Sequence, residues 1–268
     1  MVQEYGQAEI HYTVEGRRGG RTVVLLHGLV GSSEIWDGFA EELATGSRVI
    51  RVDLPGHGKS GMVSQTHGME LMADLVKAVL DREGVAECVM VGHSMGGYVT
   101  LAFAERHPAM MRGFALFHSS AFADTAERRA RRARTIEDIE RDHRAYVADF
   151  IPGLFAPAHR ERLGDEIERL VRCAQAMGAE AIVAAQRGIM ERPDRREVLA
   201  QAACPVLLVA GKLDGRVSFE TMLEVAAIPR DATALLLHDV AHMGFLEARD
   251  KVLHALRCHI ERAFGPGG

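Results

Sequence analysis

The sequence predicts an α/β protein with a doubly wound, mostly parallel β-sheet that is flanked by helices and interrupted by a helical insertion. Six short runs rich in apolar and β-branched residues alternate with segments of helical periodicity. Most runs are apolar throughout, as expected of strands buried on both faces of a parallel sheet. The alternation stops after Ser120 and resumes near Arg196, and the intervening residues are rich in Arg, Ala and Glu. We therefore expect right-handed β-α crossovers in the sheet and helices in the insertion.

The expected strands are short and are separated by segments long enough to hold a helix. They cover residues 21–27, 47–53, 87–93, 113–119, 204–211 and 232–239. In residues 68–84, apolar side chains recur at spacings of three and four, which predicts a helix with one buried face and a C-terminal cap at Gly84. A second helix is expected over residues 95–106, directly after the third strand.

The break in this alternation predicts how the chain is organised. Residues 1–120 and 196–268 are expected to form the two parts of one core, and residues 121–195 an inserted helical cap. Ligands of open α/β sheets bind at the carboxyl ends of the strands. Because the insertion leaves the end of the 113–119 strand, we expect it to lie over that edge as a lid.

The composition argues against several classes of function. The chain has 268 residues, of which 47% are hydrophobic and 26% charged, and its net charge is -5. This balance argues against a nucleic acid as partner. The longest apolar runs are far shorter than the roughly 20 residues that cross a membrane, and the first residues lack a basic stretch followed by an apolar one. We therefore expect a cytoplasmic protein with neither a nucleic-acid nor a membrane partner.

The cysteines are scattered along the chain. They are Cys88, Cys173, Cys204 and Cys258. Since they form no CxxC pair and no Cys/His cluster at zinc-ligand spacing, we expect buried, reduced thiols and neither disulfides nor a metal site.

The segment VGHSMGG, residues 91–97, places Ser94 between an expected strand and an expected helix. With no residues left for a loop, the chain must turn sharply at Ser94, which strains the backbone and brings the residues two positions before and after it close together. This explains Gly92 and Gly96. Such a turn presents the hydroxyl at a helix N-terminus, where free amides favour a developing oxyanion. A serine before a helix is also often a simple N-cap, so the segment alone leaves the choice open.

A serine nucleophile needs a histidine base that is held by a carboxylate. Asp214 follows the expected strand 204–211, and His242 follows the expected strand 232–239. Because the carboxyl ends of parallel strands meet at one edge of a sheet, both side chains should lie near Ser94.

Two other acids compete with Asp214 for this role. Asp124 also follows a strand, but with Glu127 three residues later it is interpreted as the capping box of the first cap helix. Asp239 lies three residues before His242, too close to orient the far nitrogen of the ring, and is interpreted as a turn residue. We therefore favour Asp214.

Several further motifs accompany these residues. They are HG at 27–28, DLPGHGKS at 53–60, GHSMGG at 92–97, GKLD at 211–214 and AHMGF at 241–245. With these motifs the chain resembles the α/β-hydrolase fold family over nearly its whole length. The resemblance implies a catalytic triad of Ser94, Asp214 and His242, with the backbone amides of Leu29 and Met95 binding the oxyanion. Position 241 is alanine where many relatives have glycine, a small departure that leaves the assignment of the histidine in place.

The expected cap begins with an unusual run of charge. Residues 128–134, RRARRAR, carry five arginines, and the acidic stretch EDIERD follows. On one helix these charges could simply pair along a solvated face. Alternatively, Arg128 and Arg131 form a docking site for an anion, such as a dicarboxylic ester, coenzyme A or a carrier protein, because guanidinium groups suit carboxylates and phosphates.

Together these residues predict a carboxylesterase-like serine hydrolase that needs no metal or organic cofactor. Its partner is a small-molecule acyl substrate, whose apolar part is expected to contact FIPGLFAP at 150–157, Met243 and Phe245. The same fold and triad serve thioesterases, carbon–carbon bond hydrolases, acyltransferases and lyases, so the bond that is cleaved stays open. Outside the enzymes, the alternative is a ligand receptor that keeps the pocket without turnover.

Overall fold

One β-sheet organises the part of the chain that the computed structural model describes, residues 1–5 and 8–265. In these ranges eight strands run in the order β1-β2-β4-β3-β5-β6-β7-β8. The strands are β1 (Val2–Tyr5), β2 (Ala8–Glu15), β3 (Thr22–Leu26), β4 (Arg48–Val52), β5 (Cys88–His93), β6 (Met111–Phe117), β7 (Val206–Gly211) and β8 (Ala232–Leu237). The pairs among β3 to β8 are parallel, whereas β1 and β2 add antiparallel pairs at one edge.

The predicted doubly wound, mostly parallel sheet is confirmed. The six predicted strands are β3 to β8, and their ends lie within two residues of the expected positions. Strands β3, β5 and β7 are buried along their whole length, as their uninterrupted apolar sequences require. Strands β1 and β2 were not predicted. In β2, Ile10 and Tyr12 are buried while the residues beside them are not, and this two-residue period is the signal that marks the strand.

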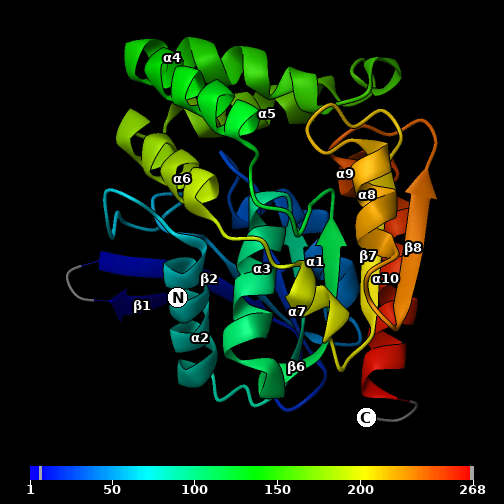
Figure 1. Cartoon of the computed structure of the whole chain (residues 1–268). Coiled ribbons are helices and arrows are strands. Elements are labelled where there is room, and N and C mark those ends of the chain that lie inside the picture. The colour runs from blue at the N-terminus through cyan, green and yellow to red at the C-terminus, as the bar shows by residue number, and fades with distance from the viewer. Residues whose placement is uncertain (6–7, 266–268) are drawn as a thin grey trace.

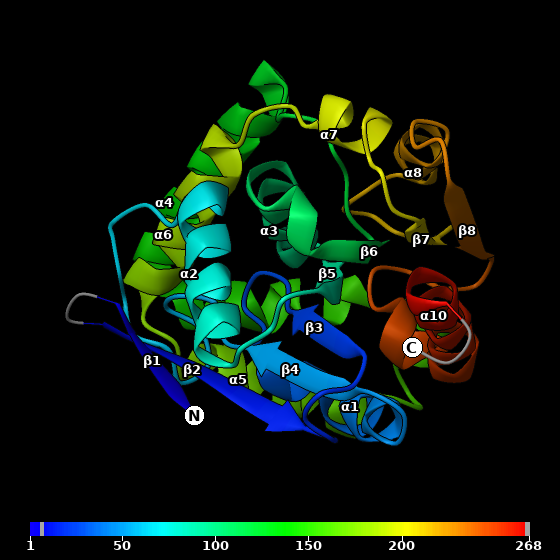
Figure 2. The same cartoon turned by 90° about the horizontal axis from the view of Figure 1, so that it is seen from below.

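Helices cover both faces of the sheet (Figure 2). α1 (Asp37–Ala44) and α10 (Arg249–Phe264) pack on one face, and α2 (Met69–Arg82), α3 (Met95–Arg106) and α8 (Phe219–Ala226) pack on the other. α2 and α3 are the two predicted helices. Gly84 follows α2 with φ +64°, a left-handed conformation that glycine adopts without strain. The shorter helices are α7 (Arg196–Ala200) and α9 (Gly244–Glu247).

Three helices between residues 121 and 195 lie above the carboxyl ends of the parallel strands (Figure 1). They are α4 (Ala126–Phe150), α5 (Gly164–Gln175) and α6 (Ala179–Glu191), and we call them the helical layer. α4 is interrupted at Asp142, where φ is -159° and ψ is 87°, and the Asp142 carboxylate accepts the N–H of Ala145. Within the described ranges, no helix combines the length and the apolar character needed to span a membrane.

The start of α4 differs from the prediction. Its cap is Thr125, whose hydroxyl accepts the N–H of Arg128 at 3.2 Å, and not Asp124. The Asp124 carboxylate binds Arg132 at 2.6 Å and Arg192 at 2.9 Å instead. Burial alone would raise the pKa of Asp124, but the two guanidinium groups hold it below its ordinary value. Asp124 therefore links α4 to the residue that follows α6.

The prediction that the cysteines are buried thiols is only half right. All are free thiols. Cys88 is buried and Cys204 is partly buried, and burial raises the pKa of the first to about 12 and of the second to about 11. Cys173, on α5, and Cys258, on α10, are exposed.

Buried histidines predict a stability that falls in acid. Burial lowers the pKa of His57 to about 3 and that of His67 and His259 to about 4. Below about pH 6.5 these side chains take up protons in the unfolded chain but not in the folded one, at about 1.4 kcal/mol per pH unit for each histidine. We expect these three histidines together to lower the free energy of unfolding by roughly 9 kcal/mol between pH 7 and pH 4.

Urea denaturation at a series of pH values measures this dependence. The His57→Gln variant should show a shallower fall, whereas His254→Gln, at an exposed position of α10, should keep the wild-type slope. A slope that is the same in all three proteins would contradict the assignment.

Candidate active site

Ser94 lies at the sharp turn between β5 and α3. Its φ is +52°, a conformation that is strained for any residue with a side chain. A Cβ atom at Gly92 would lie 2.3 Å from the carbonyl oxygen of Gly96, so a larger residue cannot occupy that position. At Gly96 a Cβ atom would lie 2.4 Å from the carbonyl oxygen of Leu26 in the neighbouring strand. Both glycines are therefore explained by close backbone approach at this turn.

Two backbone amides near this turn, those of Met95 and Leu29, are candidates for binding an oxyanion. Met95 is the first residue of α3, so its N–H has no partner inside the helix. Among the described residues, neither this N–H nor that of Leu29 donates a hydrogen bond. The loop that carries Leu29 is held by His27, whose Nε2 accepts the N–H of Leu54 at 2.9 Å and whose Nδ1 donates to the carbonyl of Gly28 at 2.8 Å. Both amides are available to a developing oxyanion.

The predicted base and acid are in contact. His242 Nδ1 lies 2.8 Å from Asp214 Oδ2, and both residues are buried. The other carboxylate oxygen, Oδ1, accepts the backbone N–H groups of Arg216 at 2.8 Å and Val217 at 3.1 Å. Burial alone would raise the pKa of Asp214, but the charge of His242 and the hydrogen bonds to the carboxylate hold it well below its ordinary value. Asp214 is thus ionised and its orientation is fixed.

Most of the site residues predicted from the sequence line one cavity. Ser94, Asp214, His242 and Leu29 all line a cavity of about 400 Å³ between the ends of the strands and the helical layer. Within the described ranges the Ser94 hydroxyl makes no hydrogen bond to His242. In empty active sites such a bond is often long and tightens only when substrate binds.

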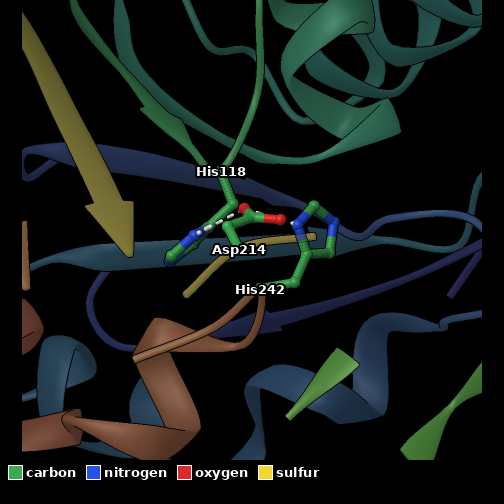
Figure 3. A group of neighbouring side chains, drawn as sticks. All are labelled: His118, Asp214 and His242. Carbon is green, nitrogen blue, oxygen red and sulfur yellow. Dashed lines mark hydrogen bonds and ion pairs between the residues drawn. The ribbon is translucent and has the colours of Figure 1, made fainter. Parts of the chain in front are cut away.

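A second histidine, which was not predicted, also contacts Asp214. His118 follows β6 and lies on the opposite side of the carboxylate from His242 (Figure 3), with its Nδ1 3.2 Å from Asp214 Oδ2. Its Nε2 accepts the N–H of Gly244 at 3.2 Å, so Nδ1 carries the proton and donates it to Asp214. Burial lowers the pKa of His118 although Asp214 favours its charged form. His118 is therefore a neutral donor.

Among the described residues, one group of side chains is close enough together to be considered as a metal site. It consists of His118, Asp214 and His242, whose potential ligand atoms all lie within 4.8 Å of one another. Both imidazole Nδ1 atoms, however, bond to the same carboxylate oxygen. To bind these Nδ1 atoms, a metal ion would have to displace the hydrogen that each of them shares with Asp214. The donor set fits a hydrogen-bonded acid and base better than a metal site.

The loop that carries His242 is fixed by Glu247, another residue that was not predicted. Its buried carboxylate accepts the backbone N–H groups of Ala241 and Met243 at 3.1 Å, one on each side of the histidine. It also accepts the N–H of Ala156, which follows α4. The His242 carbonyl in turn accepts a hydrogen bond from Nε2 of His93 at 2.9 Å. These contacts fix the backbone of His242 from several directions.

The acids that competed with Asp214 lie elsewhere. Asp124 is paired with Arg132 and Arg192 beneath the helical layer. Asp239 lies in the turn after β8, and its side chain is exposed. Neither contacts His242.

Comparison with known proteins identifies the fold family. A family model described as the α/β hydrolase fold matches residues 21–248. This chain belongs to the α/β-hydrolase fold family.

Three relatives illustrate the similarity. This α/β-hydrolase is 32% identical over 256 residues to the pimeloyl-[acyl-carrier protein] methyl ester esterase of Xanthomonas campestris pv. campestris, covering 92% of this chain and 97% of that protein. It is 30% identical over 263 residues, 93% of this chain, to the dihydrolipoyllysine-residue acetyltransferase component of the acetoin cleaving system of Pseudomonas putida, and spans 66% of that protein's length. A solved structure of a thermophilic esterase from Thermogutta terrifontis, with malate bound, matches with a TM-score of 0.91 at 28% identity, covering 96% of this chain and 95% of the other.

The α/β-hydrolase also has an apolar cavity beside Leu29. It is small, about 20 Å³, and its lining includes Ile151, Leu154 and Met243. Residues 151 and 154 belong to the segment that was expected to form an apolar acyl pocket. Phe245 was expected there too, but it is fully buried against Trp36, with ring centroids 4.4 Å apart, and lines neither this cavity nor the larger one.

The predicted anion-docking residues of this α/β-hydrolase lie on the larger cavity. Arg128 and Arg131, both in the first half of α4, line it together with Ser94. The alternative prediction, in which the charges of this helix pair with one another, holds for Arg141, which binds Asp138 at 3.0 Å. Among the described residues neither Arg128 nor Arg131 forms an ion pair, although Arg131 is exposed, as the solvated face of that alternative requires.

Proposed function

We propose that this α/β-hydrolase is a serine hydrolase that cleaves carboxylic esters of small molecules through an acyl-enzyme. The observation that carries the proposal is the shared cavity, in which Ser94 on its strained turn faces the same space as His242, whose ring is bound to Asp214. Two of the relatives described above are named esterases, which supports an ester as the bond that is cleaved.

The residues have distinct roles in the proposed reaction. His242 takes the hydroxyl proton of Ser94 while the Ser94 oxygen attacks the ester carbonyl carbon, and the carbonyl oxygen becomes an oxyanion. The amides of Leu29 and Met95 bind that oxyanion. His242 then gives the proton to the departing alcohol, which leaves an acyl group on the serine. Water, deprotonated by His242, attacks the acyl group, releases the carboxylic acid and restores Ser94.

Asp214 and the helical layer support this chemistry. Asp214 keeps the proton of His242 on Nδ1, so that Nε2 is free to accept the proton of Ser94, and it stabilises the imidazolium that forms. Residues 121–195 act as a cap over the cavity and supply much of its wall, including Arg128 and Arg131. Each step uses groups of the chain and water, so a metal or an organic cofactor has no part in it.

Covalent labelling with a fluorophosphonate tests the proposal directly. The probe reacts with an activated serine, so wild type should gain one adduct, on Ser94, detected by mass spectrometry of the intact protein and of its peptides. The Ser94→Ala variant should gain none. Failure of wild type to react, or an adduct on another serine, would rule out Ser94 as the nucleophile.

His118 is proposed as a positioning residue that acts through Asp214. The His118→Leu variant removes the Nδ1–H donor and places a branched side chain at φ +51°. We expect kcat to fall about tenfold, because Asp214 loses one of its four donors. The carboxylate then interacts more strongly with His242, so the acid limb of the kcat/KM pH profile should move to higher pH.

His118→Asn is the matched variant for this test. Asparagine tolerates a positive φ and carries an N–H donor close to the position of Nδ1. We expect it to keep the wild-type pH profile and most of kcat. A merely structural role would lower the amount of folded enzyme in the leucine variant without moving the pH profile.

A further inference from the structure

The cavity that contains Ser94 is strongly basic. Its lining includes four arginines, Arg128, Arg131, Arg132 and Arg216, but a single carboxylate, Asp214. That carboxylate is fully engaged by two imidazoles and two backbone N–H groups. Its single negative charge is too small to balance the charges of four arginines.

The four arginines differ in the contacts that their side chains make within the protein. Arg132 binds Asp124 at 2.6 Å and donates to the side-chain oxygen of Gln186 at 2.9 Å. Arg216 lies over the ring of Phe150, 4.4 Å from its centroid. For Arg128 and Arg131 the described part of the chain provides no ion pair and no side-chain hydrogen bond. The cavity thus has two guanidinium groups without a partner.

The position of Arg128 is unfavourable for the helix itself. It lies in the first turn of α4, where the free N–H groups already create a positive potential. Glu127 lies in the same turn but forms no ion pair with Arg128 among the described residues, and Asp124, just before the helix, is taken by Arg132 and Arg192. An anion that enters the cavity would relieve this concentration of positive charge.

We infer that the ester substrate carries a carboxylate, which Arg128 and Arg131 bind while the ester carbonyl lies at Ser94. The inference rests on the proposed serine hydrolase activity and names its substrate class. A cavity of about 400 Å³ is in the range that holds a small molecule. Arg128 is partly buried and Arg131 is exposed, and both line the same cavity as Ser94. A carboxylate on the substrate itself can therefore reach them from the cavity, which favours a small half-ester of a dicarboxylic acid over a docked carrier protein.

The test compares two methyl esters with the same six-carbon acyl chain. Monomethyl adipate ends in a carboxylate and methyl hexanoate ends in a methyl group, and methanol release measures the hydrolysis of both. We expect wild type to prefer monomethyl adipate by about tenfold in kcat/KM, and this preference to shrink as ionic strength rises. The Arg128→Gln, Arg131→Gln double variant should lose the preference through a higher KM for monomethyl adipate, with a far smaller change in kcat/KM for methyl hexanoate.

A matched control lies on the same helix. The Arg129→Gln, Arg134→Gln double variant removes the same charge from exposed positions of α4 that are outside the cavity. It should keep the wild-type preference. Equal losses in the two double variants would show a general effect of net charge and overturn the inference.

The outcomes also separate this inference from the proposed function. If wild type hydrolyses methyl hexanoate as well as monomethyl adipate and Ser94→Ala hydrolyses neither, the serine hydrolase stands and the carboxylate site is wrong. If wild type and Ser94→Ala hydrolyse both esters at the same rate, the proposed function itself fails.

Discussion

Replacement of Ser94 by alanine is expected to lower kcat on any ester substrate by a factor on the order of 10⁵, or about 7 kcal/mol of transition-state stabilisation. Without the hydroxyl no acyl-enzyme forms, and water must attack the ester directly. The cavity, the amides of Leu29 and Met95 and the bond between His242 and Asp214 remain. Substrate binding, measured as KM or by thermal stabilisation, should therefore change little.

Ser120→Ala is a matched control for this experiment. Ser120 is also buried and follows β6, but its hydroxyl accepts only the N–H of Phe122. Steady-state kinetics should give a kcat within a few fold of wild type. If Ser94→Ala retained more than about 1% of wild-type kcat, the nucleophile would have to be sought elsewhere.

The parts of the fold that depend on local pattern were predictable from the sequence. Apolar runs gave the parallel strands, and the glycines at 92 and 96 indicated a turn too tight for side chains. The order of Ser94, Asp214 and His242 along the chain, each after a strand, was enough to expect them in one place. The edge strands β1 and β2 carried a weaker signal because only two side chains of β2 are buried.

The supporting contacts of the site were beyond such reasoning. His118 contacts Asp214, 96 positions away in the chain, and Glu247 contacts Ala156, 91 positions away, so no short motif contains either of these pairs. The packing of the helical layer was likewise not predictable from a short motif. Arg128 and Arg131 line the cavity because of the way α4 packs. The pattern of charges does not determine this packing, because the highly charged sequence of α4 is also typical of a solvated helix.

Replacement of Asp214 by asparagine should lower kcat by a factor of about 10³ to 10⁴ without unfolding the protein. The reason lies in the four donors around the carboxylate, since Oδ1 accepts two backbone N–H groups and Oδ2 accepts both imidazoles. Asparagine has one acceptor oxygen. If that oxygen stays with the backbone, its amide nitrogen faces His242, whose Nδ1 must then accept a hydrogen bond, so the proton moves to Nε2.

In that tautomer His242 is unable to take the proton of Ser94, which makes the loss a chemical one and predicts a drop in kcat with little change in KM. Asp239→Asn is the control, because it makes the same substitution at an exposed carboxylate three residues before His242. It should have wild-type kinetics. The reverse result, with Asp239→Asn inactive and Asp214→Asn active, would identify Asp239 as the catalytic acid in place of Asp214. The contact between Asp214 and His242 would then have only a structural role.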